Sequence, residues 1–380
     1  MLCGTPDEVA EAAARYNEAG MDMPILQPIL QEDEHIQPIL EAAELYGSMA
    51  VKETIPSAVS VKESVTAASD PLDRLNPFER AWRKFSAWTE LARPFSLTGA
   101  YTPVAVAGAL AFAQGKFNLQ LFIISLASTV LLQIGANIIN EIYDVRNGVD
   151  SITSPRASQT LLKGRIKESE AFKLGIFIFG LASLLGISMA FVRGWSVIGL
   201  GVLGLIACYG YTAPPFQFKY KATGMPLVFT LMGPLTVVGA YYVITGIWSV
   251  EALIVSIPIG LLITAVLHGN EWRDIADDAR YGVGTFAAQI GRKWSFLAYV
   301  GFITAAFLSV VIAVMIKDLP VTSLLALFSL PLLVRSVQAS AMGINGQQRA
   351  IAKIDIETAQ LHAVFGMLLV IGLALGGIHG

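Results

Sequence analysis

Nine long apolar runs follow one another along this chain, and they restrict its possible folds more than any other feature. Each run is close to the roughly 17 to 25 residues that an α-helix needs to cross a bilayer. A helix satisfies its backbone hydrogen bonds within itself, so we expect nine membrane-spanning helices. They are predicted at about residues 96–114, 119–139, 172–192, 195–213, 226–247, 249–268, 295–316, 320–337 and 358–377.

The composition agrees with this topology. Hydrophobic residues make up 54% of the chain and charged residues only 14%, with a mean hydropathy of +0.60, whereas soluble domains carry about 25% charged residues. We therefore predict an all-α polytopic membrane protein with the lipid bilayer as its surroundings. The net charge of −3 gives no sign of a nucleic-acid surface, and the pattern does not set the oligomeric state.

Two related acidic motifs stand at the ends of two of the runs. The first is NIINEIYDVRNGVD at Asn137 to Asp150, the second is NEWRDIADD at Asn270 to Asp278, and both contain NExxD. On a helix, side chains at i, i+3, i+4 and i+7 share one face. This spacing aligns Asn137, Asn140, Glu141 and Asp144 in the first motif. In the second motif, successive steps of four residues place Asn270, Asp274 and Asp278 along one face. Two such faces indicate one shared cation site.

The residue types favour magnesium and a diphosphate. Mg²⁺ prefers oxygen ligands and is usually held by one or two carboxylates together with phosphate oxygens, and neither motif contains the Cys or His that zinc favours. Basic residues near the motifs would bind the remaining phosphate charge, and a diphosphate bound in a membrane implies a lipid-linked donor. These candidates are Arg156, Lys163, Lys219, Lys221 and Arg273.

The first apolar run opens with ARPFSLTGAYTPV, so Arg93 is expected at the mouth of the bundle. Two interpretations of Arg93 remain open at this stage: contact with an anionic ligand, or contact with lipid phosphate.

The distribution of Lys and Arg predicts the orientation, since basic residues collect in cytoplasmic connections. With nine spans, nearly all basic residues fall on the side of the motifs. The opposite side holds only Lys116, Arg193 and Lys317. We expect a plasma-membrane protein with its N-terminus and both motifs in the cytoplasm and its C-terminus outside.

Residues from about 88 to 377 resemble the UbiA superfamily of intramembrane prenyltransferases, which has nine helices and two Asp-rich motifs. ARPFSL, the N-x3-D-x5-D spacing with Gly148, the GPL of the fifth run, and RDxxxD followed by Gly282 and Thr285 are most similar to its 1,4-dihydroxy-2-naphthoate polyprenyltransferase branch. The resemblance implies Mg²⁺-dependent transfer of a polyprenyl group from an allylic diphosphate to an aromatic acceptor, with loss of the acceptor carboxylate, as in menaquinone biosynthesis.

The resemblance also implies residue roles. The metal and diphosphate ligands would be Asn140, Asp144, Asp150, Asn270, Asp274 and Asp278, of which Asn140, Asp144, Asn270 and Asp274 would be catalytic. Arg273, Lys219 and Lys221 match diphosphate-binding positions less closely. Glu141 and Glu271 depart from the family, which often has Asp or Asn there, and this leaves the acceptor open.

Two rival functions remain. Another branch of the superfamily would use 4-hydroxybenzoate or geranylgeranylglyceryl phosphate as the acceptor. A secondary transporter also contains intramembrane acids and broken helices, but its carboxylates should lie near the bilayer midplane, whereas these stand at helix ends. No residue is singled out as a general base.

The N-terminal part differs in character from the rest. Residues 4–48 resemble the C-terminal tail of luciferase-like flavin or deazaflavin oxidoreductases, without the barrel that would hold a cofactor, so no redox activity is expected. We predict a small soluble segment at 1–48, a linker at 49–77 and the membrane domain at 78–380. Phe78 to Leu91, FERAWRKFSAWTEL, alternates aromatic and basic residues at helical spacing, which predicts a helix in the membrane interface.

Overall fold

The computed structural model describes residues 76–147, 159–280, 283–344 and 348–378, and every regular element within these ranges is a helix. The chain divides into two units, Met1–Arg80 and Ala81–Gly380, and the second holds the helical bundle. The helices found throughout the described ranges confirm the all-α prediction. The expected segment at 1–48 and the linker expected at 49–77, up to residue 75, lie outside the described residues.

Eight helical segments are long and apolar enough to cross a membrane within the part of the chain that the structure describes. They are Pro94–Ala113 (η2 and α5), Leu119–Arg146 (α6), Glu168–Arg193 (α8), Gly224–Thr245 (α10, η4 and α11), Val250–Ile275 (within α12, Val250–Arg280), Phe286–Met315 (α13), Val321–Ile344 (η5 and α14) and Ile354–Gly377 (within α15, Ile354–Ile378). Each corresponds to one predicted span.

The remaining predicted span is α9 (Trp195–Gly210), which has only 16 residues. At about 1.5 Å per residue it is shorter than a hydrocarbon core of about 30 Å. The expected nine spans are therefore eight full-length segments and one short apolar helix. It sits where the fourth span was predicted.

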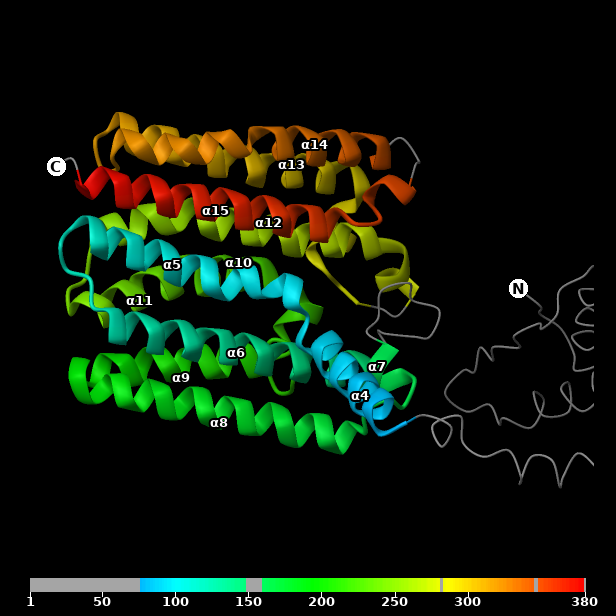
Figure 1. The fold of residues 1–380 in the computed structure, drawn as a ribbon. Helices are drawn as coiled ribbons and strands as arrows, with labels where there is room; N and C mark the ends of the chain where they lie inside the picture. Colours follow the sequence, from blue (N-terminus) through cyan, green and yellow to red (C-terminus); the bar gives the residue numbers. More distant parts are fainter. Residues whose placement is uncertain (1–75, 148–158, 281–282, 345–347, 379–380) are drawn as a thin grey trace, which may run out of the picture. The chain divides into compact units, whose positions relative to one another are not determined.

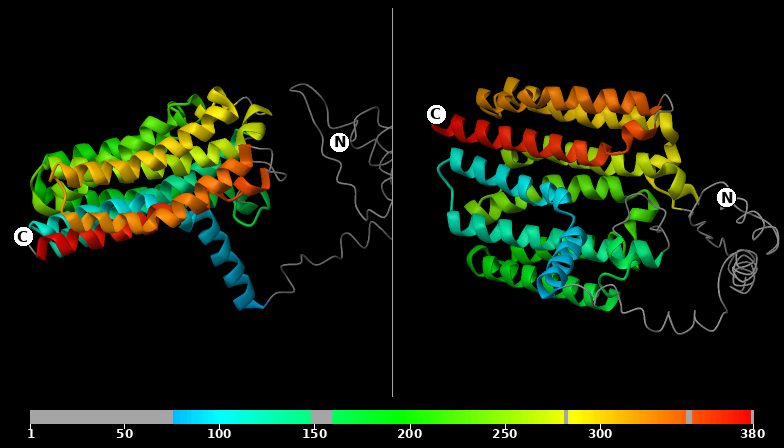
Figure 2. Two further views of the ribbon diagram at one scale, coloured as in Figure 1. Left: turned by 90° about the horizontal axis from the view of Figure 1, so that it is seen from above. Right: turned by 45° about the vertical axis from the view of Figure 1, so that its right-hand side comes forward.

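The helices run side by side in the bundle (Figure 1). Contacts between neighbours close a circuit: α5 packs on α6, α6 on α8, α8 on α9, and α9 on α11, while α11 contacts α12, α12 contacts α13, α13 contacts α14, α14 contacts α15, and α15 returns to α5. Figure 2 shows the same arrangement from two further sides. This circuit brings α6 and α12, which carry the two motifs, into one bundle.

The predicted fifth span, made of α10, η4 and α11, comes very close to α12 at one point. Gly233 and Pro234 lie in η4 (Leu231–Leu235), a π-helical turn within this span. A Cβ atom on Gly233 would lie 2.8 Å from Gly260 Cα on α12. Since no side chain fits there, glycine is needed at this crossing.

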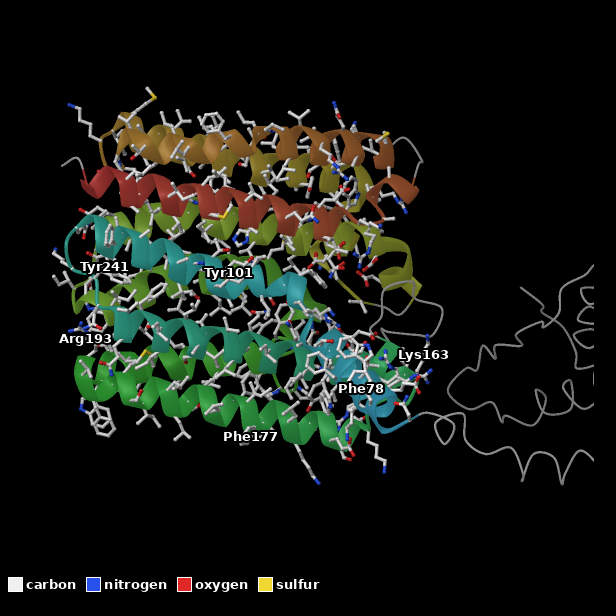
Figure 3. All side chains as sticks on the ribbon, viewed as in Figure 1. Phe78, Tyr101, Lys163, Phe177, Arg193 and Tyr241 are labelled. Carbon is white, nitrogen blue, oxygen red and sulfur yellow. The ribbon has the colours of Figure 1, made fainter. Side chains whose placement is uncertain are left out.

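Large apolar side chains cover the outside of the bundle, as expected for a protein that faces lipid. Phe191 is 88% exposed and Phe177 is 65% exposed, both on α8, and Figure 3 shows Phe177 on the outer side of this helix. The helix predicted at residues 78–91 is present as α4 (Pro77–Ala92). Its Trp82 and Phe85 are exposed, while Leu91 is buried.

Candidate active site

The first motif lies on the last turns of α6, which continues as a helix to Arg146. Glu141 and Asp144 are buried, at 0% and 1% exposure, and Asn137 is buried beside them. The Asn137 amide Nδ2 donates to the backbone oxygen of Ala92 at 2.7 Å. The predicted helical face is thus turned inward, and it is fixed to the segment that begins the first span.

Three oxygens of the first motif converge on one cation. The Lys219 ammonium, from η3 (Phe218–Lys221), lies 2.6 Å and 2.7 Å from Asp144 Oδ1 and Oδ2 and 3.4 Å from Asn140 Oδ1. The Tyr220 hydroxyl donates to Asp144 Oδ1 at 2.8 Å. Asn140 and Asp144 therefore form a preformed oxygen cluster that binds positive charge.

The second motif, on α12, repeats this arrangement. Arg273 Nε and Nη2 each lie 2.5 Å from a carboxylate oxygen of Asp274, and Nη2 also donates to Asn270 Oδ1. Arg273 Nη1 lies 2.5 Å from Asp355 Oδ2, on the first turn of α15. In both motifs the Asn and the Asp four residues later hold one cationic side chain between them.

The two motifs are close enough to affect each other electrostatically. Burial raises the pKa of Asp278 to about 6, with Asp274 and then Asp144 adding to the rise, while Lys219 and a hydrogen bond from Thr285 oppose it. Asp278 belongs to α12 and Asp144 to α6, so carboxylates of both motifs share one electrostatic environment. The shared cation site that the two helical faces indicate stays a prediction.

Tyr211 is near enough to several of these groups for their charges to act on it. Burial raises its pKa well above the usual value, Glu271 and Asp144 raise it further, and Arg93 lowers it. Arg93, which precedes η2 (Pro94–Leu97), has left-handed backbone angles (φ 51°, ψ 68°) and its Nη2 lies 3.1 Å from Glu141 Oε2. Arg93 is thus part of the motif cluster and forms an ion pair with a carboxylate of the first motif.

The start of α13 supports the second motif. The Thr285 hydroxyl donates to Asp278 Oδ2 at 3.1 Å and accepts from the Ala288 amide at 3.3 Å, as a helix N-cap does. Glu271 Oε2 accepts from the Ala287 amide at 3.3 Å. These contacts hold the end of α12 against the beginning of α13.

The other predicted basic residues are placed differently. Lys163 and Lys221 are exposed. Figure 3 shows Lys163 at the opposite end of the bundle from Arg193 and Tyr241. Asp150 and Arg156 lie outside the described residues.

Sequence reasoning missed three partners of the motifs: Tyr220, Thr285 in its capping role, and Asp355. Tyr220 is next to the predicted ligand Lys219, and Thr285 is the N-cap of α13. Both could therefore have been recognised from their neighbours in the sequence. Asp355 is 82 positions from Arg273 in the chain, and only the packing of α15 brings it to the site.

The donor set fits magnesium by its chemistry, since it consists of carboxylate and amide oxygens that already gather around positive charge. Within the described ranges, however, no three His, Cys, Asp or Glu side chains are arranged to bind a single metal ion. Asp144 and Asp274 are each held by a basic side chain instead. The predicted ligand Asp150 falls outside those ranges.

Comparison with known proteins agrees with this fold. The family described as "UbiA prenyltransferase family" matches residues 101–343. The chain is 28% identical over 286 residues to the 1,4-dihydroxy-2-naphthoate octaprenyltransferase of Bacillus subtilis, covering 75% of this chain and 91% of that protein. It is 30% identical to the UbiA prenyltransferase domain-containing protein 1 of Rattus norvegicus, covering 78% and 86%.

A solved structure supports the architecture. The apo structure of a UbiA homolog from Aeropyrum pernix K1 superposes with a TM-score of 0.52 at 15% identity, over 72% of this chain and 97% of that one. The fold and the family match together define a multi-pass membrane prenyltransferase. The chain belongs to the UbiA prenyltransferase family.

Proposed function

We propose that this protein transfers a polyprenyl group from an allylic diphosphate to an aromatic acceptor, and that the acceptor is 1,4-dihydroxy-2-naphthoate, as in menaquinone biosynthesis. The observation that carries the proposal is the paired arrangement of the motifs, in which Asn140 and Asp144 hold Lys219 while Asn270 and Asp274 hold Arg273. At each motif, oxygens that can bind a cation thus lie beside a basic group that can bind an anion.

The metal ligands proposed are Asn140, Asp144, Asp150, Asn270, Asp274 and Asp278. Mg²⁺ bound there would neutralise diphosphate charge and so favour cleavage of the allylic C–O bond. Lys219 and Arg273, released from the motif oxygens, would donate hydrogen bonds to the departing diphosphate as its negative charge increases. Lys163, Lys221 and Arg156 are proposed to contribute weaker attraction from the exposed connections.

The reaction balances without a further reactant. The naphthoate ring carbon that bears the carboxylate attacks the allylic carbon, and the diphosphate leaves with the electron pair of the C–O bond. The carboxylate then leaves as CO₂, and the electrons of its C–C bond restore the aromatic ring. The name of the Bacillus subtilis relative supports this acceptor, as does the N-x3-D-x5-D spacing of the first motif.

We place the motifs at the cytoplasmic face of the plasma membrane, with the C-terminus outside. Lys and Arg collect on the motif side of the bundle, which supports this orientation. The segments 1–48 and 49–77 are proposed to be an accessory extension and a linker to the prenyltransferase domain at 78–380.

The test is a reconstitution. Purified protein in detergent is incubated with Mg²⁺, a polyprenyl diphosphate and a set of acceptors: 1,4-dihydroxy-2-naphthoate, 4-hydroxybenzoate and geranylgeranylglyceryl phosphate. Products are identified by mass, and CO₂ release is followed with a carboxyl-labelled naphthoate. Prenylated naphthoquinol with stoichiometric CO₂ is the expected result. Prenylation of another acceptor alone would reject the menaquinone assignment and keep the transferase.

A further inference from the structure

Asp355 is a buried carboxylate that contacts the second motif from outside it. It stands on the first turn of α15, and its Oδ2 lies 2.5 Å from Arg273 Nη1, with both side chains only 10% exposed. It also lies beyond residues 101–343, to which the family match extends. A charge buried at such a place requires a reason, because taking an ion out of water costs several kcal/mol.

The guanidinium of Arg273 is divided between two acidic groups. One edge, Nε and Nη2, faces Asp274 at 2.5 Å, while Nη1 faces Asp355. A planar guanidinium can form such paired contacts on separate edges, which an ammonium cannot do. Arg273 therefore bridges α12 and α15.

Packed helices support the position of Asp355. Ile354 packs against α12 so closely that a Cβ on Gly269 would lie 3.3 Å from Ile354 Cγ2. The Tyr299 hydroxyl lies 2.6 Å from Thr358 Oγ1, which ties the same turn of α15 to α13. Asp355 is thus held by packed helices and not by a loop, which suits a group that positions another side chain.

We propose that Asp355 is a positioning residue that keeps Arg273 at the donor site when Asn270 and Asp274 bind the metal ion. This inference rests on the proposed function. Both carboxylate oxygens of Asp274 contact Arg273. At least one of these contacts has to break before Asp274 can bind the metal ion. When Mg²⁺ replaces Arg273 at the Asp274 oxygens, Arg273 keeps Asp355 as its carboxylate partner. Its Nε and Nη2 edge then turns toward the diphosphate.

The prediction follows from removing the charge of Asp355. In Asp355→Asn, Arg273 has to rely on Asp274, so the cation competes harder with Mg²⁺ for the same oxygens. We expect Mn²⁺ binding to the substrate-free protein, followed by electron paramagnetic resonance, to weaken roughly tenfold and the donor KM to rise by about the same factor, as for the loss of one charge-assisted contact. The acceptor KM should stay unchanged, and Asp355→Glu should restore most of the loss.

A matched control stands two residues further along α15. Glu357 pairs with Arg335 at 3.1 Å, and the arginine of that pair is 68% exposed. Glu357→Gln removes an acid from the same helix turn and should leave all three constants unchanged. Asp355→Asn and Asp355→Ser are both made, with thermal unfolding in detergent as the folding check, so the test survives if one of them does not fold.

A double-mutant cycle separates a positioning role from a merely structural one. If Asp355 acts through Arg273, adding Asp355→Asn to Arg273→Lys should raise the donor KM by much less than it does in the wild-type enzyme. Full additivity would overturn the proposal, as would a wild-type donor KM in both Asp355 variants or an equal rise in the acceptor KM. A wild-type protein without Mg²⁺-dependent transfer would instead overturn the proposed function itself.

Discussion

Lys219 and Asp144 stand 75 positions apart in the chain, yet the lysine ammonium lies 2.6 Å and 2.7 Å from the two carboxylate oxygens. Asp144 is 1% exposed, and a buried carboxylate is costly unless it is paired. Lys219 therefore acts as the counter-ion of Asp144. Arg273 has the same relation to Asp274 in the second motif.

Replacing either motif aspartate should abolish turnover. Asp144→Asn or Asp274→Asn removes a charged oxygen while keeping the side-chain volume, so we expect a loss of at least about 100-fold in kcat with the fold retained. Activity is measured with saturating Mg²⁺, and folding by size exclusion in detergent. The exposed acid Glu170 on α8 supplies the control, since Glu170→Gln should behave as wild type. Near-normal activity in either motif variant would reject the metal assignment.

Lys219→Met should separate metal binding from catalysis. If the ammonium occupies the same oxygens that hold Mg²⁺, removing it takes away a competitor, and metal binding to the substrate-free protein should tighten. The donor KM should nevertheless rise by roughly tenfold, because one charge-assisted contact to the diphosphate is lost. Mn²⁺ binding followed by electron paramagnetic resonance measures the first effect.

Weaker Mn²⁺ binding in Lys219→Met would contradict the competition between Lys219 and the metal ion, because it would show that the lysine supports the metal ligands. Lys221→Met is the matched control: this lysine is exposed on the same short helix, and its loss should leave Mn²⁺ binding unchanged.

Much of the architecture is predictable from the sequence because a bilayer permits few solutions. A chain with long apolar runs has to form helices there, and the period of the helix alone aligns Asn140 with Asp144 and Asn270 with Asp274. The count of nine spans is approximate, since the span expected at 195–213 corresponds to α9, an apolar helix of 16 residues.

The partners of the motif residues are harder to predict. The sequence indicates Lys219 as a diphosphate ligand because it is basic and close to a span end, but nothing local indicates that it would bind Asp144. Arg93 is expected from the sequence to meet a ligand or lipid phosphate, and its contact with Glu141 depends on the packing of α6 against the start of the first span. Such contacts arise from tertiary structure, about which a helical period carries no information.

The crossing of η4 and α12 should be intolerant of side chains. Gly233→Ala would place a methyl group 2.8 Å from Gly260 Cα, where only backbone can give way. We expect destabilisation by about 1 to 3 kcal/mol, the usual cost of overpacking. Gly204→Ala on α9 is the control, because nothing lies within 4 Å of the position that its methyl group would take. Denaturation in mixed detergent measures both, and equal stability of the two variants would refute the close crossing.

Removing residues 1–75 should leave prenyl transfer largely intact. The acidic motifs and the side chains found to contact them all lie within Ala81–Gly380, the unit that contains the bundle. The truncated protein is compared with the full chain by kcat/KM for the donor after both have been checked for membrane insertion. A correctly inserted but inactive truncation would show that the N-terminal segment completes the site.

A naphthoate acceptor is anionic, and we propose Arg93, at the mouth of the bundle, as the cation that binds its carboxylate. The contact of Arg93 with Glu141, which is 0% exposed, means that Arg93→Ala would also remove an ion pair from a buried acid. Breaking such a pair is strongly destabilising, by about 3 to 5 kcal/mol. Arg93→Lys keeps the charge and removes the planar fork that binds a carboxylate through two hydrogen bonds.

We therefore expect Arg93→Lys to raise the naphthoate KM by roughly tenfold, the loss of one strong contact, with little change in the donor KM, which is the pattern of lost binding to one substrate. Glu141→Gln is the companion variant: it removes the charge that holds Arg93 and should affect the naphthoate in the same direction. An acceptor without a carboxylate, 1,4-dihydroxynaphthalene, should be insensitive to Arg93→Lys. Equal rises in the donor and acceptor KM would place Arg93 at the diphosphate instead.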